Sequence, residues 1–135
     1  MLAVLAIDVT GDGDADLVRV AFAELLRARV PGLPDLPVRL GGSGVTLTLP
    51  GLLAPSQVYD LAGAVAAEAG PLVVAGRLIG MTASIGVAVS DTLPVEELVR
   101  RATVAMHEAR RYAPRTSWAI WRESFDHHES LADAA

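Results

Sequence analysis

The sequence constrains its fold most strongly between residues 38 and 49, where four consecutive small residues separate two apolar stretches. Val38-Arg39-Leu40 precedes the turn Gly41-Gly42-Ser43-Gly44, and Val45-Thr46-Leu47-Thr48-Leu49 follows it. Glycine adopts the positive φ angles that tight turns require. The second stretch alternates apolar and polar residues, so one of its faces is expected to meet the core and the other to meet solvent. The pattern predicts a β-hairpin.

Strands and helices are predicted on both sides of this hairpin. Residues 2–7 are continuously apolar, end at Asp8 and predict a buried central strand. Helical spacing of apolar residues predicts three helices, over residues 15–30, over a segment that Ser56 caps and Gly70-Pro71 ends, and from Pro94 to Ala109. Further strands are predicted at residues 72–79, 81–89 and 118–121. The order predicts an α+β domain, with helices packed on one face of a mainly antiparallel sheet.

The composition narrows the class of protein. With 135 residues and 52% apolar residues, the chain is expected to form one domain over residues 1–121, followed by a polar tail over residues 122–135. The net charge of −5 argues against binding to nucleic acid, and the absence of cysteine excludes disulfides and thiolate metal sites. No apolar run is long enough to span a bilayer, so we expect no membrane segment and a cytoplasmic location.

Three blocks of the sequence resemble one family. They are Leu2 to Asp8, the Arg39-Leu40-Gly41-Gly42 stretch, and the segment from Met81-Thr82-Ala83-Ser84-Ile85-Gly86-Val87-Ala88 into the helix that holds Ala102, Met106 and Arg110. In this order they resemble the GGDEF domain of diguanylate cyclases. The resemblance implies a nucleotidyl-cyclase palm with a ferredoxin-like core.

The catalytic positions of that family are altered here. In working members, an Asp after the first strand and an acid at the third hairpin position hold two divalent cations, which activate a hydroxyl and neutralise a triphosphate. Asp8 matches the first of these. The signature itself reads Gly41, Gly42, Ser43, Gly44 and Val45, and Thr10 replaces a second Asp. The resemblance therefore implies a degenerate motif without catalytic residues, and a chain that is not an enzyme.

Its ligand sites are altered as well. Only five residues separate Asp8 from Asp14, which leaves no room for the family's base-binding loop. Upstream of the hairpin, Asp35 remains from the inhibitory product site but its arginine is gone, so cyclic dinucleotide binding is not expected. Arg110 stands where the family has a phosphate-contacting lysine, and it remains able to meet an anion.

Three functions are left open. The leading hypothesis is a catalytically inactive GGDEF-like domain that acts as a signalling or regulatory interaction module, through a protein partner or as a homodimer. A second is a nucleotide or anion sensor without catalysis, built from Arg39, Arg110 and the amides of the turn.

The third hypothesis is a Ca²⁺ site, or less favourably a Mg²⁺ site, formed by Asp8, Asp12, Asp14 and Asp16. The competing interpretation is that the acids of this loop favour the N-terminus of the next helix. No other cofactor is expected.

Two smaller features bear on contacts and charge. Trp118 and Trp121 lie three residues apart in a predicted strand, so they are expected to point to opposite faces, one of them as an exposed contact residue. Arg100 and Arg101 are interpreted as solvated charges on the polar face of the last helix.

Overall fold

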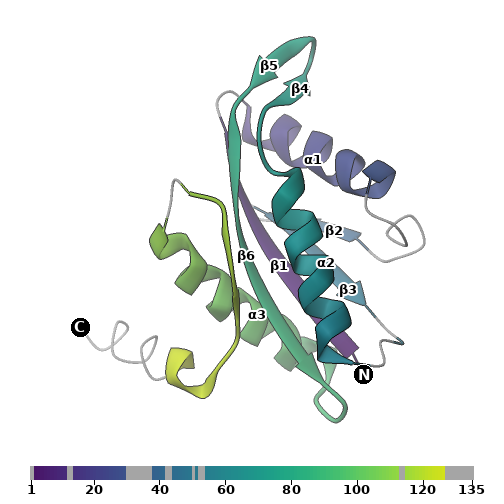
Figure 1. Ribbon diagram of the computed structural model, residues 1–135, viewed down its shortest axis with the longest axis vertical. Helices are drawn as coiled ribbons and strands as arrows, with labels where there is room; N and C mark the ends of the chain where they lie inside the picture. Colours follow the sequence, from purple (N-terminus) through teal and green to yellow (C-terminus); the bar gives the residue numbers. More distant parts are fainter. Residues whose placement is uncertain are drawn as a thin grey trace.

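The computed structural model describes residues 2–11, 14–29, 38–41, 44–49, 51, 54–112 and 115–126, with the backbone alone at residues 38–41. Within these ranges five strands form the main sheet in the order β2 (Val38–Gly41), β3 (Gly44–Leu49), β1 (Leu2–Gly11), β6 (Met81–Ser90) and β7 (Ser117–Ile120) (Figure 1). Every neighbouring pair is antiparallel except β6 and β7, which run parallel. The prediction of a mainly antiparallel sheet with a central first strand is confirmed.

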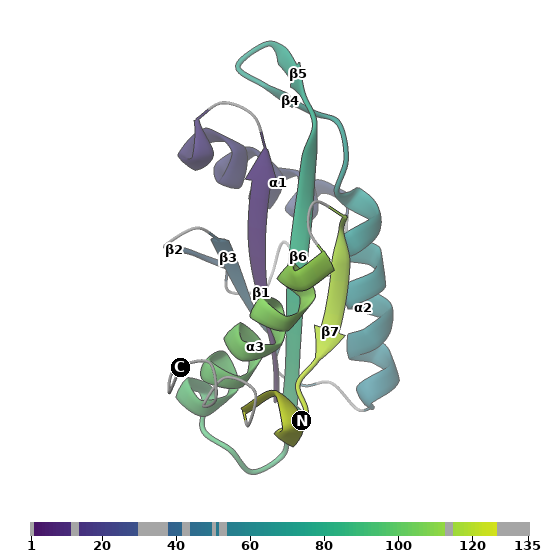
Figure 2. The ribbon, with the colours of Figure 1, turned by 90° about the vertical axis from the view of Figure 1, so that its left-hand side faces the viewer.

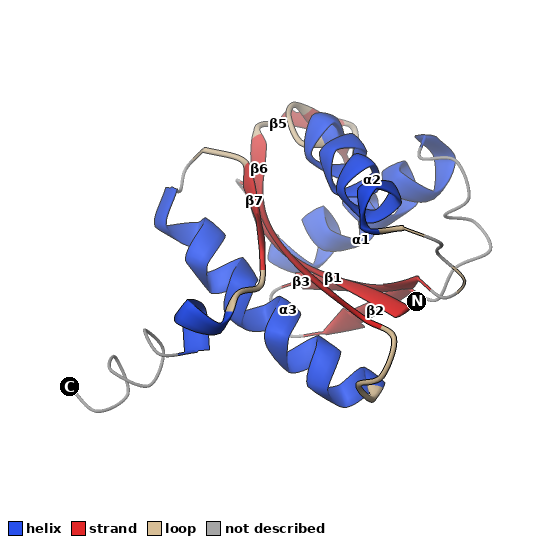
Figure 3. Cartoon of the chain, turned by 60° about the horizontal axis from the view of Figure 1, so that its bottom comes forward, coloured by secondary structure: helices blue, strands red, loops and turns tan. Residues whose placement is uncertain are grey.

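Helices cover both faces of this sheet, so the expectation of a single covered face is wrong. Helices α1 (Ala15–Arg29) and α2 (Pro55–Glu68) lie on one side, and α3 (Val95–Ala109) lies on the other (Figure 3). The reason is in β1 itself, because its apolar residues occupy both odd and even positions. Leu5 and Ile7 join the larger core with α1 and α2, whereas Val4 and Ala6 join a smaller core with α3. The fold class is α+β, as predicted.

Helix α3 approaches β6 very closely at Gly86. A Cβ atom placed on Gly86 would overlap the carbonyl oxygen of Ala102 and the amide nitrogen of Met106. Glycine therefore sets how near the helix lies to the sheet. This fixes the position of the residues at the end of α3.

Several predicted boundaries need correction. β1 continues three residues past Asp8 to Gly11, because it pairs with β6 along its whole length. The predicted strand at residues 72–79 is instead a hairpin of β4 (Leu72–Val74) and β5 (Arg77–Ile79), which projects beyond the main sheet (Figure 1). Ala75 and Gly76 have φ angles of 51° and 78° and turn the chain.

The start of α2 also differs from the prediction. Ala54 is the N-cap residue and Pro55 the first helical one, so Ser56 lies inside the helix and caps nothing. Proline has the φ angle of a helix already fixed and needs no N–H partner at this position. The Gln57 side chain accepts the N–H of Ala54 at 2.9 Å.

Two short helical elements follow α3 in the described chain, besides the strand β7. A short 3₁₀ helix, η2 (Arg110–Tyr112), leads towards β7, and a helical turn covers residues 123–126. The division into a domain and a tail at residue 122 stays a prediction. None of the described helices combines the length and apolarity needed to cross a membrane.

Candidate functional site

Asp8 lies within β1 and its side chain is buried, with 6% of the residue exposed. It faces the α3 side of the sheet, because it alternates in phase with Val4 and Ala6. Its neighbours across the sheet are Gly44 of β3 and Ser84 of β6, and Ser117 of β7 lies beside Ser84. We call these four residues the Asp8 row. Small and polar residues thus form a row across the sheet, beneath the C-terminal end of α3.

Arg110 lies against Asp8 at that end of the helix. Its Nε atom is 3.2 Å from Oδ2 of Asp8, and the two side chains are 52% and 7% exposed. A buried carboxylate needs a compensating positive charge, since leaving it unpaired in a medium of low dielectric constant is costly. The guanidinium supplies that charge from within the chain. Binding of an external anion by Arg110 stays a prediction.

Gly44 has no space for a side chain. A Cβ atom placed there would overlap the carbonyl oxygen of Ile7, and the carbonyl carbon of Ile7 would be only 3.0 Å away. Both atoms belong to the backbone of β1, so the clash is relieved only by moving one strand away from the other. Any side chain at this position, acidic or not, would therefore disturb the pairing of β1 with β3.

The Ser117 side chain is occupied by α3. Its hydroxyl donates a hydrogen bond to the carbonyl of Ala109 at 2.8 Å. The last carbonyls of a helix lack partners within the helix, and this bond satisfies one of them. Ser117 therefore holds the end of α3 over the sheet, next to Arg110.

The other predicted motif residues are only partly described. Gly42, Ser43, Asp35 and Asp12 lie outside the described residues, and so does the side chain of Arg39. Gly41 and Gly44 pair with each other at the end of the hairpin. Val45 is 1% exposed and belongs to the core, so it acts structurally.

The described acids of the predicted calcium loop are engaged at the start of α1. Asp14 Oδ1 accepts the backbone N–H groups of Asp16 and Leu17, at 2.9 and 3.2 Å. Asp16 forms an ion pair with Arg19. The Asp14 contacts are those expected of a helix N-terminus, where side-chain oxygens satisfy free N–H groups, and the Asp16 pair is an i,i+3 contact on the helix surface.

No group of three or more metal-binding side chains occurs within the part of the chain that the structure describes. With Asp12 undescribed, the calcium site stays a prediction.

Sequence reasoning missed one charged cluster, on the outer face of α3. Arg100 bonds both Glu97, at 2.7 Å, and Asp126, at 3.0 Å, so it is not a simple solvated charge. Arg101 pairs with Glu97 and lies 3.9 Å from the centre of the Trp121 ring. Glu97 precedes the two arginines by three and four residues, and this helical spacing could have predicted the ion pairs.

These contacts shift the ionisation of the carboxyl groups. Hydrogen bonds from Arg100 and then Arg101 lower the pKa of Glu97 to about 2. The pKa of Asp126 is lowered as well, chiefly by its hydrogen bond with Arg100. The cluster fastens the segment after β7 to α3.

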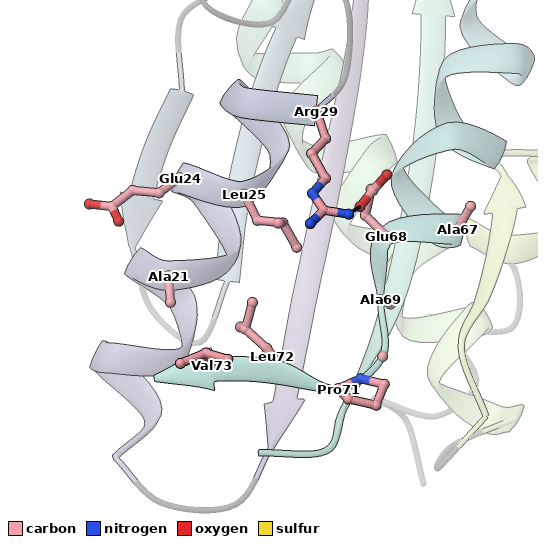
Figure 4. Close-up of a pocket in the computed structure, with 11 residues that line it drawn as sticks. Ala21, Glu24, Leu25, Arg29, Ala67, Glu68, Ala69, Pro71, Leu72 and Val73 are labelled. Atoms are coloured by element: carbon pink, nitrogen blue, oxygen red, sulfur yellow. Dashed lines mark ion pairs between the residues drawn. The ribbon is translucent and has the colours of Figure 1, made fainter. Parts of the chain in front are cut away.

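A separate cavity of about 600 Å³ lies between α1 and the end of α2 (Figure 4). Alanine, leucine and valine side chains form much of its wall. Arg29 and Glu68 point toward one another across it, 3.9 Å apart. The third charged residue of its wall is Glu24, and none of the predicted site residues lines the cavity.

Comparisons with known proteins give matches among solved structures alone, since neither a protein-family model nor a curated protein matches the sequence. The GGDEF domain of the Pseudomonas aeruginosa protein called TpbB or YfiN is 26% identical and has a TM-score of 0.79, over 96% of this chain and 81% of that one. A sensory box/GGDEF family protein from Caulobacter crescentus is 28% identical, with a TM-score of 0.63 over 82% and 78%.

A third structure shares the fold at lower identity. It is the active GGEEF domain of a diguanylate cyclase from Vibrio cholerae, 19% identical with a TM-score of 0.64, over 90% of this chain and 83% of that one. These likenesses confirm the predicted palm architecture.

Proposed function

We propose that this chain, which is a GGDEF-like domain, has no cyclase activity and serves as a signalling module that acts by binding protein, either a partner or a second copy of itself. The fold and the likeness to GGDEF domains of signalling proteins support a signalling role. The arrangement around Asp8 supports the absence of catalysis.

The ion pair of Asp8 with Arg110 carries the proposal. A divalent cation needs several oxygen ligands with enough negative charge to replace its hydration shell. The one acid retained at the family's cation-binding positions, Asp8, is buried and has a guanidinium 3.2 Å away. A cation entering here would be repelled by Arg110 and would have to displace it from its carboxylate. No cation-activated hydroxyl is then available for phosphoryl transfer.

Gly44 adds a geometric obstacle to the electrostatic one. The family pattern has an acid at this position, whereas the close approach of β1 and β3 excludes any side chain. The lack of cyclase activity would then be caused by the close spacing of β1 and β3 as well as by the replaced side chains. Restoring the acids by substitution would not by itself restore a site.

Turnover of GTP tests the catalytic part of the proposal. The purified chain, its Asp8→Ala variant and an active diguanylate cyclase are incubated with GTP and either Mg²⁺ or Mn²⁺. We expect the wild type and the variant to be equal and indistinguishable from the reaction without protein. Cyclic dinucleotide formation that the substitution abolishes would refute it.

A rebuilt motif tests why activity is absent. The Ser43→Asp/Gly44→Glu variant is expected to unfold at lower urea concentration than the wild type and to remain inactive, because a side chain at position 44 forces β1 and β3 apart. If the variant were stable and produced cyclic dinucleotide, the side chains alone would account for the loss, and the roles given to Arg110 and the strand spacing would be wrong.

An anion sensor is the second candidate, because Arg110 keeps half of its surface exposed while it contacts Asp8. A thermal-shift measurement with GTP and with a cyclic dinucleotide tests it. Stabilisation that disappears in Arg110→Gln would favour a sensor, whereas no shift with either ligand would favour the interaction module.

A further inference from the structure

The outer edge of β7 pairs with no other strand within the described residues. β7 is the last strand of the sheet on its side, and Figure 2 shows it next to β6. The N–H of Trp121 bonds the carbonyl of Val87 at 2.8 Å. Because the direction of the backbone groups alternates along a strand, those of Trp118 and Ile120 point away from β6. They are available to another strand.

The residues of this edge do not protect it from pairing. Natural sheet edges usually carry charged residues, proline or bulges that prevent association with another chain. β7 reads Ser-Trp-Ala-Ile and contains neither charge nor proline. Only the short length of the strand, four residues, limits its pairing with another chain. An edge of this composition suits the addition of an extended segment.

A cavity of about 410 Å³ runs beside this edge, and we call it the β7 hollow. Its wall includes Tyr112, Ser117, Trp118, Ala119, Arg122 and Phe125. Tyr112 is 65% exposed and Trp118 is 37% exposed, so two large aromatic side chains are accessible at this edge. Trp118 also lies 6.1 Å from the ring of Tyr59 on the α2 side. Alternate side chains of an added strand would thus meet aromatic rings on both faces.

The hollow has an arginine in its wall that no described carboxylate pairs with, although the chain as a whole carries −5. Arg122 lines the hollow and Arg115 precedes β7 by two residues, and neither has a carboxylate partner among the described residues. The one acid in the wall, Glu108, is already paired with Arg111 at 2.8 Å. The unbalanced arginines complement an acidic partner.

We propose that the open edge of β7 binds an extended, acidic segment of a partner protein, which adds a strand to the sheet and places an aromatic or aliphatic side chain in the β7 hollow. This binding surface rests on the proposed function as an interaction module, for which it supplies the location and the class of partner. Binding at the edge does not depend on whether the chain turns over GTP.

Peptide binding to the full chain tests this. The probe is a fluorescein-labelled peptide that alternates glutamate with valine around a central phenylalanine, and its counterpart has lysine in place of glutamate. We expect the acidic peptide alone to bind, by fluorescence anisotropy, and to slow hydrogen exchange at the amides of Trp118 and Ile120. The amide of Ala119 faces β6 and is expected to be protected already.

Two charge reversals provide a matched pair. Arg122→Glu is expected to weaken binding of the acidic peptide by about fivefold or more, as loss of a favourable charge pair at a rim implies. Arg77→Glu makes the same change on the distant β5 strand, where the exposed side chain has no ion pair in the described structure, and is expected to change nothing.

Other outcomes would overturn the inference. Absence of binding would do so, as would equal affinity for the lysine peptide, or binding that leaves the amides of Trp118 and Ile120 exchanging freely. Protection without peptide that rises with protein concentration would identify a second copy as the occupant instead. GTP turnover by a chain that still binds the peptide would refute the proposed lack of catalysis and leave the β7 edge as a binding surface.

Discussion

At the scale of single residues, two glycines determine how closely elements approach one another. Gly44 sets the distance between β1 and β3, and Gly86 sets that between β6 and α3. Both positions bring backbone against backbone, where no rotamer change can relieve an overlap. Close contacts between backbone atoms therefore affect both the stability of the fold, at Gly86, and the space for an acidic side chain at the catalytic motif, at Gly44.

Gly86→Ala is expected to lower the free energy of unfolding by about 2–3 kcal/mol, because the new methyl group must push α3 off the sheet. Urea denaturation followed by circular dichroism measures the change. Gly63→Ala in α2 is the control, since no atom lies within 4 Å of a Cβ there. In a helix interior it should stabilise by about 0.5–1 kcal/mol. Equal effects of the two substitutions would argue against close packing at Gly86.

The Asp8 ion pair leads to a second prediction. Arg110→Gln should destabilise by about 1–2 kcal/mol, less than for a fully buried pair because the guanidinium is half exposed. Adding Asp8→Asn should recover part of this loss, which a double-mutant cycle measures.

The control for that cycle is Arg111→Gln, which breaks the more exposed pair with Glu108 and should cost no more than about 0.5 kcal/mol. A cycle without coupling between Asp8 and Arg110 would contradict the ion pair.

At the scale of elements, the β4–β5 hairpin shows where local sequence was insufficient. Residues 72–79 are almost all apolar, which favours one continuous strand, and Ala75-Gly76 is a weak turn signal compared with Asn-Gly. The structure nevertheless turns there, with a positive φ at both residues. Packing of Leu72 and Val74 against the larger core outweighs the unfavourable conformation of Ala75.

Ala75→Asn should therefore stabilise the chain by about 0.5–1 kcal/mol, because asparagine tolerates the left-handed region better than alanine does. The melting temperature and the urea midpoint both report it. The same change at the exposed helical residue Ala64 should destabilise by about 0.5 kcal/mol. A loss of stability at both positions would indicate that the turn at Ala75 is not formed in solution.

At the scale of the whole molecule, the order of elements and the palm architecture could be predicted because the apolar periods of strands and helices are local signals. The placement of α3 on the opposite face from α1 and α2 could not. That depends on which residues of β1 and β6 each helix contacts, and both faces of these strands are apolar. The sequence motif identified Asp8 and Arg110 as candidate site residues, but it could not predict that the two side chains pair with each other.

The attachment of the C-terminal segment to α3 should depend on pH. The pKa of Glu97 is lowered from 4.5 to about 2, and that of Asp126 is lowered too. Depressed folded-state pKa values stabilise the folded chain above the ordinary pKa, and this contribution is lost as pH falls from about 4.5 to about 2. The urea midpoint and Trp121 fluorescence should therefore change through this range.

Glu97→Gln should flatten that pH dependence, since glutamine does not titrate. Glu24→Gln, at an exposed position without an ion pair in the described chain, should leave the dependence as in the wild type. A flat wild-type profile between pH 4.5 and 2 would show that the cluster does not hold the segment in solution.

The placement of β1 at the centre of the sheet has a consequence for synthesis. Its register with β6 pairs Leu2 with Ser90, so one of the two neighbours of β1 is translated nearly ninety residues after it. While the ribosome translates the intervening segment, the apolar residues of the N-terminal strand have no complete sheet to join, and nascent chains in this state are prone to aggregate. Production in the cell should accordingly benefit from chaperones that bind near the ribosomal exit.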